Sequence, residues 1–155
     1  MLPEIERSAG RAFIGSSQAA VATDNVTPAT FYAPLIPQGR VWVASDDGRL
    51  IGFAACEAFQ DALHLWELAV RLDAQKQGAG RALVEAVVTD AAGRGLPAVT
   101  LTTFRDIAFN APFYARLGFA EIPEGQLNPR LASVCAHEAE LGLDVANRCA
   151  MRLDL

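Results

Sequence analysis

The residues with the clearest chemical meaning lie between Val70 and Arg81, where an apolar stretch runs into Gln75-Lys76-Gln77-Gly78-Ala79-Gly80. The apolar stretch is typical of a buried strand, and the residues after Gly78 are typical of an amphipathic helix. The first turn of a helix has backbone N–H groups without intrahelical partners and the positive end of the helix dipole, and glycines let an anion approach the backbone closely. The turn therefore predicts a binding site for a phosphate or diphosphate group.

The spacing of the glycines separates several kinds of phosphate-binding turn. A dinucleotide-binding fingerprint has three glycines directly after the strand, whereas here the turn is longer and Leu83 stands at the third position. A Walker loop has Gly-Lys-Ser or Gly-Lys-Thr, which the chain lacks. Gly78 and Gly80 alone are also compatible with an ordinary tight turn between a strand and a helix. The residues that flank the glycines are therefore needed to identify the kind of turn.

Two motifs together resemble the GNAT superfamily of N-acetyltransferases. Gln75, Gly78 and Gly80 are similar to the acyl-CoA motif of that family, Gln/Arg-x-x-Gly-x-Gly/Ala. After a predicted strand, Phe113-Tyr114-Ala115-Arg116-Leu117-Gly118-Phe119 resembles the family's aromatic-Tyr-x-x-x-Gly-Phe element. The likeness covers residues 41–119 well and the flanks poorly.

The resemblance implies an α/β fold with a mixed, mostly antiparallel central sheet, flanking helices and a splayed strand pair that forms the acyl-CoA cleft. It implies acetyl-CoA as cosubstrate, no metal ion, and transfer of the acetyl group to an amine. Backbone groups of Leu68, Ala69 and Val70 would bind the pantetheine arm. The diphosphate would be held by the residues of the turn, which are Gln75, Lys76, Gln77, Gly78, Ala79, Gly80 and Arg81.

Three side chains are candidates for proton transfer, because the attacking amine must be neutral and the CoA sulfur should leave protonated. Tyr114 is similar to the family's general acid. Glu67 is the preferred base, since a carboxylate in an apolar strand is costly to desolvate unless it has a function, and burial raises its pKa. His64 is the alternative base, although a lone histidine in an apolar strand is more often structural. The expected oxyanion donor is the amide of Val70 or Ala69, which the sequence does not distinguish.

Two positions depart from the family pattern. Where the family often has an asparagine that contacts CoA, this chain has Ile107, and Asn110 either takes over that contact or caps the short helix that follows. The family's first strand normally precedes its first helix, whereas this chain opens on a predicted helix. Either that strand is missing or the start codon has been placed late. A missing strand would leave an unpaired sheet edge and favour association with a second copy.

The elements that must position these residues alternate between helix and strand. The expected helices span 2–14, 78–94, 111–117 and 128–141, and the segment 15–39 is expected to be a loop with a short helix near 29–35. The expected strands span 40–45, 50–59, 61–72, 98–104, 119–122 and 148–155. Asp46-Asp47-Gly48 predicts a hairpin turn between the first two strands. A stripe near the last helix is expected to pack in the core, and its members are Ala132, Cys135, Ala136, Ala139 and Leu143.

Length and composition are typical of one globular domain spanning 1–155, with 52% hydrophobic and 20% charged residues. A net charge of -5 gives no basic field for nucleic acid or an anionic membrane, so neither is an expected partner. The cytoplasm is the expected location, because no apolar run reaches the about 18 residues of a membrane span and the first residues are acidic. Three cysteines without a Cys-x-x-Cys pair indicate neither a disulfide framework nor a zinc site.

The acceptor stays open at this stage between a small-molecule amine and a protein or peptide amine, with the acidic chain favouring a cationic one. The family resemblance also implies a possible homodimer. A non-catalytic acyl-CoA-binding module with the same fold is the main alternative function. A nicotinamide oxidoreductase is a further alternative and predicts binding of NAD(P)H.

Overall fold

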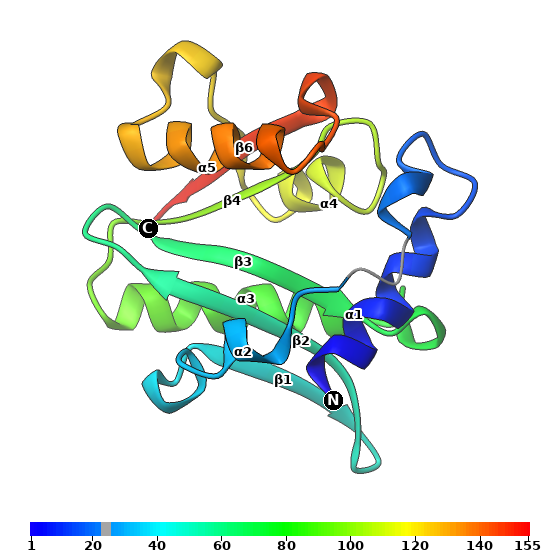
Figure 1. The fold of residues 1–155 in the computed structure, drawn as a ribbon. Helices are drawn as coiled ribbons and strands as arrows, with labels where there is room; N and C mark the ends of the chain where they lie inside the picture. Colours follow the sequence, from blue (N-terminus) through cyan, green and yellow to red (C-terminus); the bar gives the residue numbers. More distant parts are fainter. Residues whose placement is uncertain (23–25) are drawn as a thin grey trace.

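The computed structural model describes residues 1–22 and 26–155, so positions 23–25 of the predicted loop at 15–39 lie outside the described residues. The strands form one sheet in the order β1-β2-β3-β4-β6-β5 (Figure 1). They are β1 (Val41–Asp46), β2 (Arg49–Ala58), β3 (Leu63–Val70), β4 (Ala98–Phe104), β5 (Ala120–Glu121) and β6 (Arg148–Asp154). The α-helices are α1 (Leu2–Gly10), α2 (Ala29–Tyr32), α3 (Ala79–Gly93), α4 (Ala111–Arg116) and α5 (Pro129–Glu140).

The pairing of the strands confirms the predicted mixed, mostly antiparallel sheet. All neighbours are antiparallel except β3 and β4, which are parallel. The predicted hairpin joins β1 to β2 through Asp47 and Gly48, which both have left-handed backbone angles with φ of 44° and 80°. Aspartate and glycine tolerate this conformation better than most residues, which explains why they mark the turn.

The parallel pair β3 and β4 splays apart, as expected. The two strands are paired only at Leu63 with Val99, His64 with Thr100 and Leu65 with Leu101. Both strands continue beyond this point, and Figure 1 shows them diverging toward the side of the molecule where α1 lies. The second half of β3 therefore has a neighbouring strand on one side only.

A β-bulge at Trp66 changes the direction of the side chains along β3. Glu67 and Leu65 pair with adjacent residues of β2, so Trp66 has no partner in the register. In a regular strand, residues three apart point to opposite faces. Because of the extra residue, Leu65 and Leu68 both pack in the core under α3. The bulge therefore turns Glu67 toward the other face of the sheet, where α1 packs.

The sheet divides the core into two layers. The layer under α3 includes Leu65, Val84, Leu101 and Met151. The layer under α1 and α2 is smaller and consists of Ile5, Tyr32, Leu35, Phe53, Ala55 and Ala69, all less than a tenth exposed. Full burial of a large aliphatic side chain stabilises a fold by about 1.5–3 kcal/mol, so the smaller layer suffices to fix α1 on the sheet.

The prediction that an apolar stripe of α5 packs in the core is wrong. Ala132, Ala136 and Ala139 are exposed, and the buried residue of α5 is Leu131. Polar contacts attach the helix instead. Arg130 forms an ion pair with Asp61 at 2.7 Å and Glu138 forms one with Arg148 at 2.7 Å.

The amino-terminal part of the described chain begins with α1. Among the described residues no strand precedes α1, and β1 lies at the edge of the sheet. The predicted helix 2–14 is α-helical only to Gly10 and continues as a 3-10 turn over Arg11–Phe13. In the described part of the chain, no helix combines the length and the apolar character required to cross a bilayer.

Candidate active site

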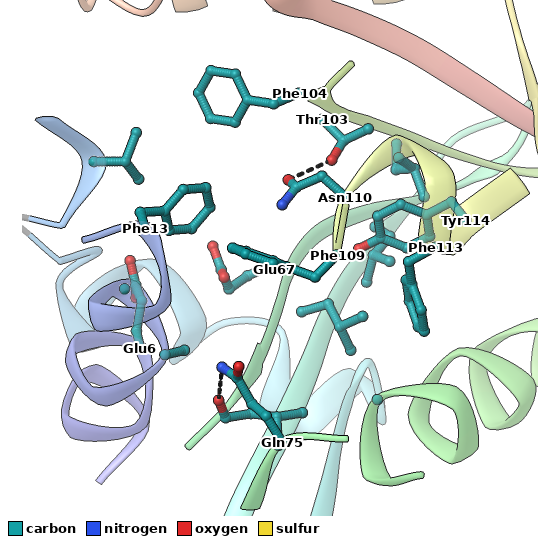
Figure 2. Close-up of a pocket in the computed structure, with 18 of the residues that line it drawn as sticks. Glu6, Phe13, Glu67, Gln75, Thr103, Phe104, Phe109, Asn110, Phe113 and Tyr114 are labelled. Carbon is teal, nitrogen blue, oxygen red and sulfur yellow. Dashed lines mark hydrogen bonds between the residues drawn. The ribbon is translucent and has the colours of Figure 1, made fainter. Parts of the chain in front are cut away.

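A cavity of about 680 Å³ opens where β3 and β4 separate (Figure 2). This volume lies within the range of about 300–1,000 Å³ that is usual for ligand pockets. Many of the predicted site residues line it, namely Glu67, Leu68, Val70, Gln75, Lys76, Gly78, Gly80, Arg81, Asn110 and Tyr114. Four others are absent from its described lining, namely His64, Ala69, Gln77 and Ala79.

The backbone of β3 presents alternate residues to the cavity. The amide of Arg71 donates a 2.8 Å hydrogen bond to the carbonyl of Ile51 on β2. In an antiparallel pair, the polar groups of every second residue point toward the partner strand. The backbone groups of Ala69 therefore face β2, whereas those of Leu68 and Val70 face the cavity. Of the two predicted oxyanion donors, the Val70 amide therefore faces the cavity and the Ala69 amide faces β2.

The turn between β3 and α3 leaves its backbone amides available. Lys76 and Gly78 have left-handed backbone angles, with φ of 62° and 92°. Within the described part of the chain, no protein group accepts a hydrogen bond from the amides of Lys76 through Arg81. A diphosphate accepts several hydrogen bonds and carries negative charge, so the turn fits such a group.

Lys76, Arg81 and Arg116 line the cavity, and the first two belong to the turn itself. Arg81 and Arg116 also line a second, smaller hollow together. Arg81 is exposed and forms an ion pair with Glu85 one helical turn away, at 2.8 Å. Arg116 belongs to the predicted aromatic motif, in which it was not singled out as a candidate site residue.

The carboxylate of Glu67 faces the cavity from β3, between α1 and α4 in Figure 2. Among the described residues it makes no hydrogen bond and no ion pair. Burial raises the pKa of Glu67 to about 8, and the negative charge of Glu6 adds to this, while Arg148 acts in the opposite direction. A carboxylate with this pKa is suited to accept a proton near neutral pH.

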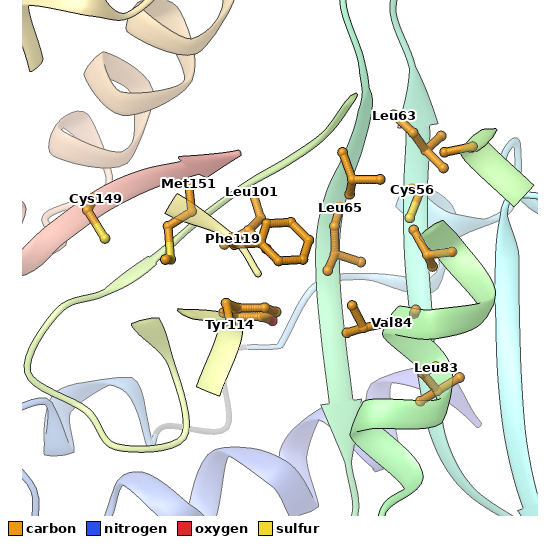
Figure 3. Close-up of a cluster of buried hydrophobic side chains, with 14 residues drawn as sticks. Cys56, Leu63, Leu65, Leu83, Val84, Leu101, Tyr114, Phe119, Cys149 and Met151 are labelled. Atoms are coloured by element: carbon orange, nitrogen blue, oxygen red, sulfur yellow. The ribbon is translucent and has the colours of Figure 1, made fainter. Parts of the chain in front are cut away.

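Tyr114 reaches the cavity from the core layer under α3 (Figure 3). The side chain is 8% exposed, and its ring contacts those of Phe113 and Phe119 edge to face. Burial raises the pKa of the Tyr114 phenol, and the charge of Glu67 raises it further. The hydroxyl is therefore protonated at neutral pH and able to donate.

His64 does not line the cavity, and it lies in the part of β3 that is still paired with β4. It is 1% exposed, and its Nδ1 atom is 2.9 Å from Oγ1 of Thr100. Its ring packs on Trp66 with 4.4 Å between the centroids. Burial, together with the charge of Arg130, lowers the pKa of His64 to about 3. The structure brings Glu67 and Tyr114 together and leaves His64 apart.

Asn110 lines the cavity and does not cap α4 with its side chain. Its Oδ1 atom accepts a 2.7 Å hydrogen bond from Oγ1 of Thr103, which orients the amide (Figure 2). In the part of the chain that the structure describes, the Nδ2 group donates no hydrogen bond. Ile107, at the position that departs from the family pattern, is buried.

One wall of the cavity was not predicted from the sequence. Glu6 and Phe13 line it from the amino-terminal segment, and Phe104 and Phe109 line it from the end of β4 and the following loop. The ring of Phe13 is 5.0 Å from that of Phe109 and 6.1 Å from that of Phe104, between centroids. A signal was present, because Glu6, Ala9, Gly10 and Phe13 have the spacing of one helical face.

Within the described residues, no group of three or more His, Cys, Asp or Glu side chains is placed to hold a metal ion.

The chain is similar to known proteins in sequence and in fold. The family model described as "Acetyltransferase (GNAT) family" matches residues 10–119. Among curated proteins, the [Ribosomal protein bS18]-alanine N-acetyltransferase of Escherichia coli K12 is 32% identical over 77 residues, which are 50% of this chain and 52% of that protein. The chain thus aligns with about half the length of the curated relatives it matches.

Solved structures share the fold at lower sequence identity. The PaiA N-acetyltransferase of Thermoplasma acidophilum, solved in complex with coenzyme A, has a TM-score of 0.71 at 13% identity, covering 99% of this chain and 91% of that one. The ribosomal-protein-S18-alanine N-acetyltransferase of Escherichia coli has a TM-score of 0.61 at 21% identity, covering 83% of this chain and 77% of that one.

Proposed function

Because the chain belongs to the GNAT acetyltransferase family, we propose that it transfers the acetyl group of acetyl-CoA to a primary amine by direct attack of the amine on the thioester. One observation carries the proposal: Glu67 and Tyr114 line the cavity at the splay of β3 and β4, next to a turn whose amides are free. A base, an acid and a diphosphate site are the parts that this reaction needs.

The chain would hold the cosubstrate along β3 and the turn that follows. The cavity-facing backbone groups of Leu68 would bind the pantetheine arm as a further strand would, next to the Val70 amide at the thioester. The amides from Lys76 to Arg81 would bind the diphosphate, and the side chains of Lys76, Arg81 and Arg116 would add positive charge. Relatives of the same fold were solved with coenzyme A or acetyl coenzyme A, which supports this assignment.

Acetyl-CoA, when bound, supplies an activated thioester carbonyl. Glu67 accepts a proton from the acceptor amine, directly or through water, so that the nitrogen lone pair attacks the carbonyl carbon and the C–N bond forms. The Val70 amide donates a hydrogen bond to the oxygen that gains negative charge. Glu67 passes this first proton to solvent and then takes the second proton of the nitrogen as the C–S bond breaks. Tyr114 gives its proton to the sulfur, and solvent carries the second proton from Glu67 back to Tyr114. The products are an N-acetylated amine and the free thiol.

A thiol-release assay tests the proposal. The protein is incubated with acetyl-CoA and a panel of primary amines, and free CoA is measured with a thiol reagent. We expect release that depends on the amine and falls by at least about a hundredfold in Glu67→Gln, which is the usual scale of general base catalysis. The alternative, a non-catalytic acyl-CoA-binding module, predicts acetyl-CoA binding without release for every amine.

A further inference from the structure

The cavity has a second end that the cosubstrate does not need. The cations Lys76 and Arg81 belong to the turn at one end. The other end lies between α1 and the carboxyl end of β4, and its walls are formed by Glu6, Val21, Val26, Phe13, Phe104 and Phe109. Glu67 lies between the two ends, so a group bound at the second end is placed for reaction with the thioester.

Glu6 presents a fixed negative charge at this second end. Its Oε1 atom accepts hydrogen bonds from the amide and Oγ1 of Thr27 at 2.9 and 3.0 Å, and its Oε2 atom accepts one from Oη of Tyr32 at 2.9 Å. These donors are neutral, and in the described part of the chain Glu6 has no ion pair. The carboxylate is thus oriented but not neutralised, and its charge acts on Glu67.

The cation at this end is already neutralised. Arg148 lines the cavity, but its guanidinium binds both carboxylate oxygens of Glu138, at 2.7 and 3.1 Å, and also contacts Oγ1 of Thr102 at 3.0 Å. It lies over the ring of Phe104 at 4.6 Å from the centroid. Two of the three guanidinium nitrogens of Arg148 are engaged in this ion pair, so Arg148 binds a carboxylate of the acceptor less well than an unpaired arginine would.

The rest of this end is apolar. The rings of Phe13, Phe104 and Phe109 form a continuous edge-to-face cluster. Aromatic rings bind apolar groups by burial and cations through their negative faces. The second end therefore offers an anionic anchor beside an aromatic wall.

On the basis of the proposed function, we infer that the acceptor is a primary ammonium next to an aromatic or other apolar group and without a nearby carboxylate, and that Glu6 anchors the ammonium. Alkylamines have pKa values near 10.4, so they arrive protonated at neutral pH. Glu6 would bind the arriving cation, and Glu67 would then remove the proton. An α-amino acid is disfavoured because its carboxylate would face both glutamates.

Three matched acceptors test the chemistry. 2-Phenylethylamine and phenylalaninamide carry the amine and the ring, and phenylalanine has a carboxylate in place of the amide of phenylalaninamide. We expect kcat/KM for phenylalanine to be at least about thirtyfold lower than for the other two, on the scale of a close like-charge contact. A tetrapeptide that begins with phenylalanine distinguishes a small amine from a peptide terminus as the source of this group.

Glu6→Gln tests the anchor, because glutamine keeps one oxygen for the two hydrogen bonds from Thr27, and its amide nitrogen can donate to Oη of Tyr32 in place of the bond that Oε2 accepts. We expect KM for 2-phenylethylamine to rise about tenfold with kcat changed less than threefold, and calorimetry to show about tenfold weaker binding of the amine alone. Glu4→Gln is the matched control, since it removes the same charge from an exposed position of α1 that does not line the cavity. Phe109→Ala, at a residue 43% exposed, should raise KM for 2-phenylethylamine but not for ethylamine.

The outcomes separate this inference from the proposed function. Thiol release with amines, combined with equal use of phenylalanine and an unchanged KM in Glu6→Gln, would overturn the inference and leave the acetyltransferase assignment intact. Amine binding that weakens in Glu6→Gln but no thiol release with any acceptor would support the anchor and reject the proposed function.

Discussion

The Nε2 atom of Gln75 donates a 3.0 Å hydrogen bond to the carbonyl oxygen of Val70, the last residue of β3. This bond joins the end of the strand to the turn that precedes α3. Both proposed contacts with acetyl-CoA depend on it, since the Val70 amide lies on the strand side and the free amides begin at Lys76. The glutamine of the acyl-CoA motif therefore has a structural role, because its side chain holds the turn against the end of β3.

Gln75→Ala should weaken acetyl-CoA binding by about five- to tenfold, the scale expected for loss of one hydrogen bond of about 1 kcal/mol that orders the turn. Calorimetric titration with acetyl-CoA measures the effect. Gln77→Ala is the matched control, because the Gln77 side chain bonds the carbonyl of Asp73 within the same turn but does not line the cavity. Equal effects of the two substitutions would show that Gln75 has no special role.

The pH profile of acetyl transfer should report the ionisation of Glu67. The base acts when it is ionised, and the pKa of Glu67 is raised to about 8. The value of kcat/KM should therefore rise as the pH increases and level off above this pKa, falling by about tenfold for each unit below it.

Glu67→Gln should remove this step from the profile. The acceptor amine titrates equally in both proteins, so the comparison isolates the carboxylate. A profile that keeps its inflection near pH 8 in Glu67→Gln would assign the titration to another group.

The same carboxylate should make stability depend on pH. The pKa of Glu67 is raised from about 4.5 to about 8 by folding, so between these values the folded chain holds a proton that the unfolded chain has lost. Stability therefore falls as the pH rises through this window. In urea unfolding, the difference in the free energy of unfolding between Glu67→Gln and the parent protein should shift in favour of Glu67→Gln when the pH is raised from 4.5 to 8.5. The corresponding difference for Glu4→Gln should not change. A difference that is the same at both pH values would argue against the raised pKa.

The order of helices and strands was predictable because each depends on short patterns. The Asp47-Gly48 turn and the glycines that follow β3 mark the ends of strands, because these residues tolerate left-handed backbone angles. The acyl-CoA motif and the aromatic motif were recognisable for the same reason. Each motif is contiguous in the sequence, and local backbone geometry determines its residue types.

The wall formed by Glu6 and the aromatic cluster was not predictable in this way. Phe13 and Phe109 are almost a hundred positions apart in the sequence, and only the packing of α1 on the sheet brings them together. The bulge at Trp66 is a property of two strands in register, and it decides that Glu67 shares a face with α1. No sequence pattern within β3 indicates that Glu67 faces α1.

Tyr114→Phe should lower kcat by at least about tenfold with less than a twofold change in the affinity for acetyl-CoA, because the ring keeps its packing and only the donated proton is lost. Burial raises the pKa of Tyr114, so the parent hydroxyl supplies a proton at every working pH. Stopped assays for kcat and calorimetry for affinity separate the two effects. An unchanged kcat would reject Tyr114 as the acid.

His64→Gln should affect stability far more than activity. His64 is buried against Thr100 and Trp66, so the substitution disturbs a packed hydrogen bond, with an expected loss of about 1–3 kcal/mol in the free energy of unfolding. An imidazole whose pKa is lowered to about 3 is too weak a base to take a proton from an amine. We therefore expect kcat to stay within about threefold of the parent value once the protein is folded. A hundredfold loss of kcat with an unchanged melting temperature would instead make His64 the base and remove Glu67 from that role.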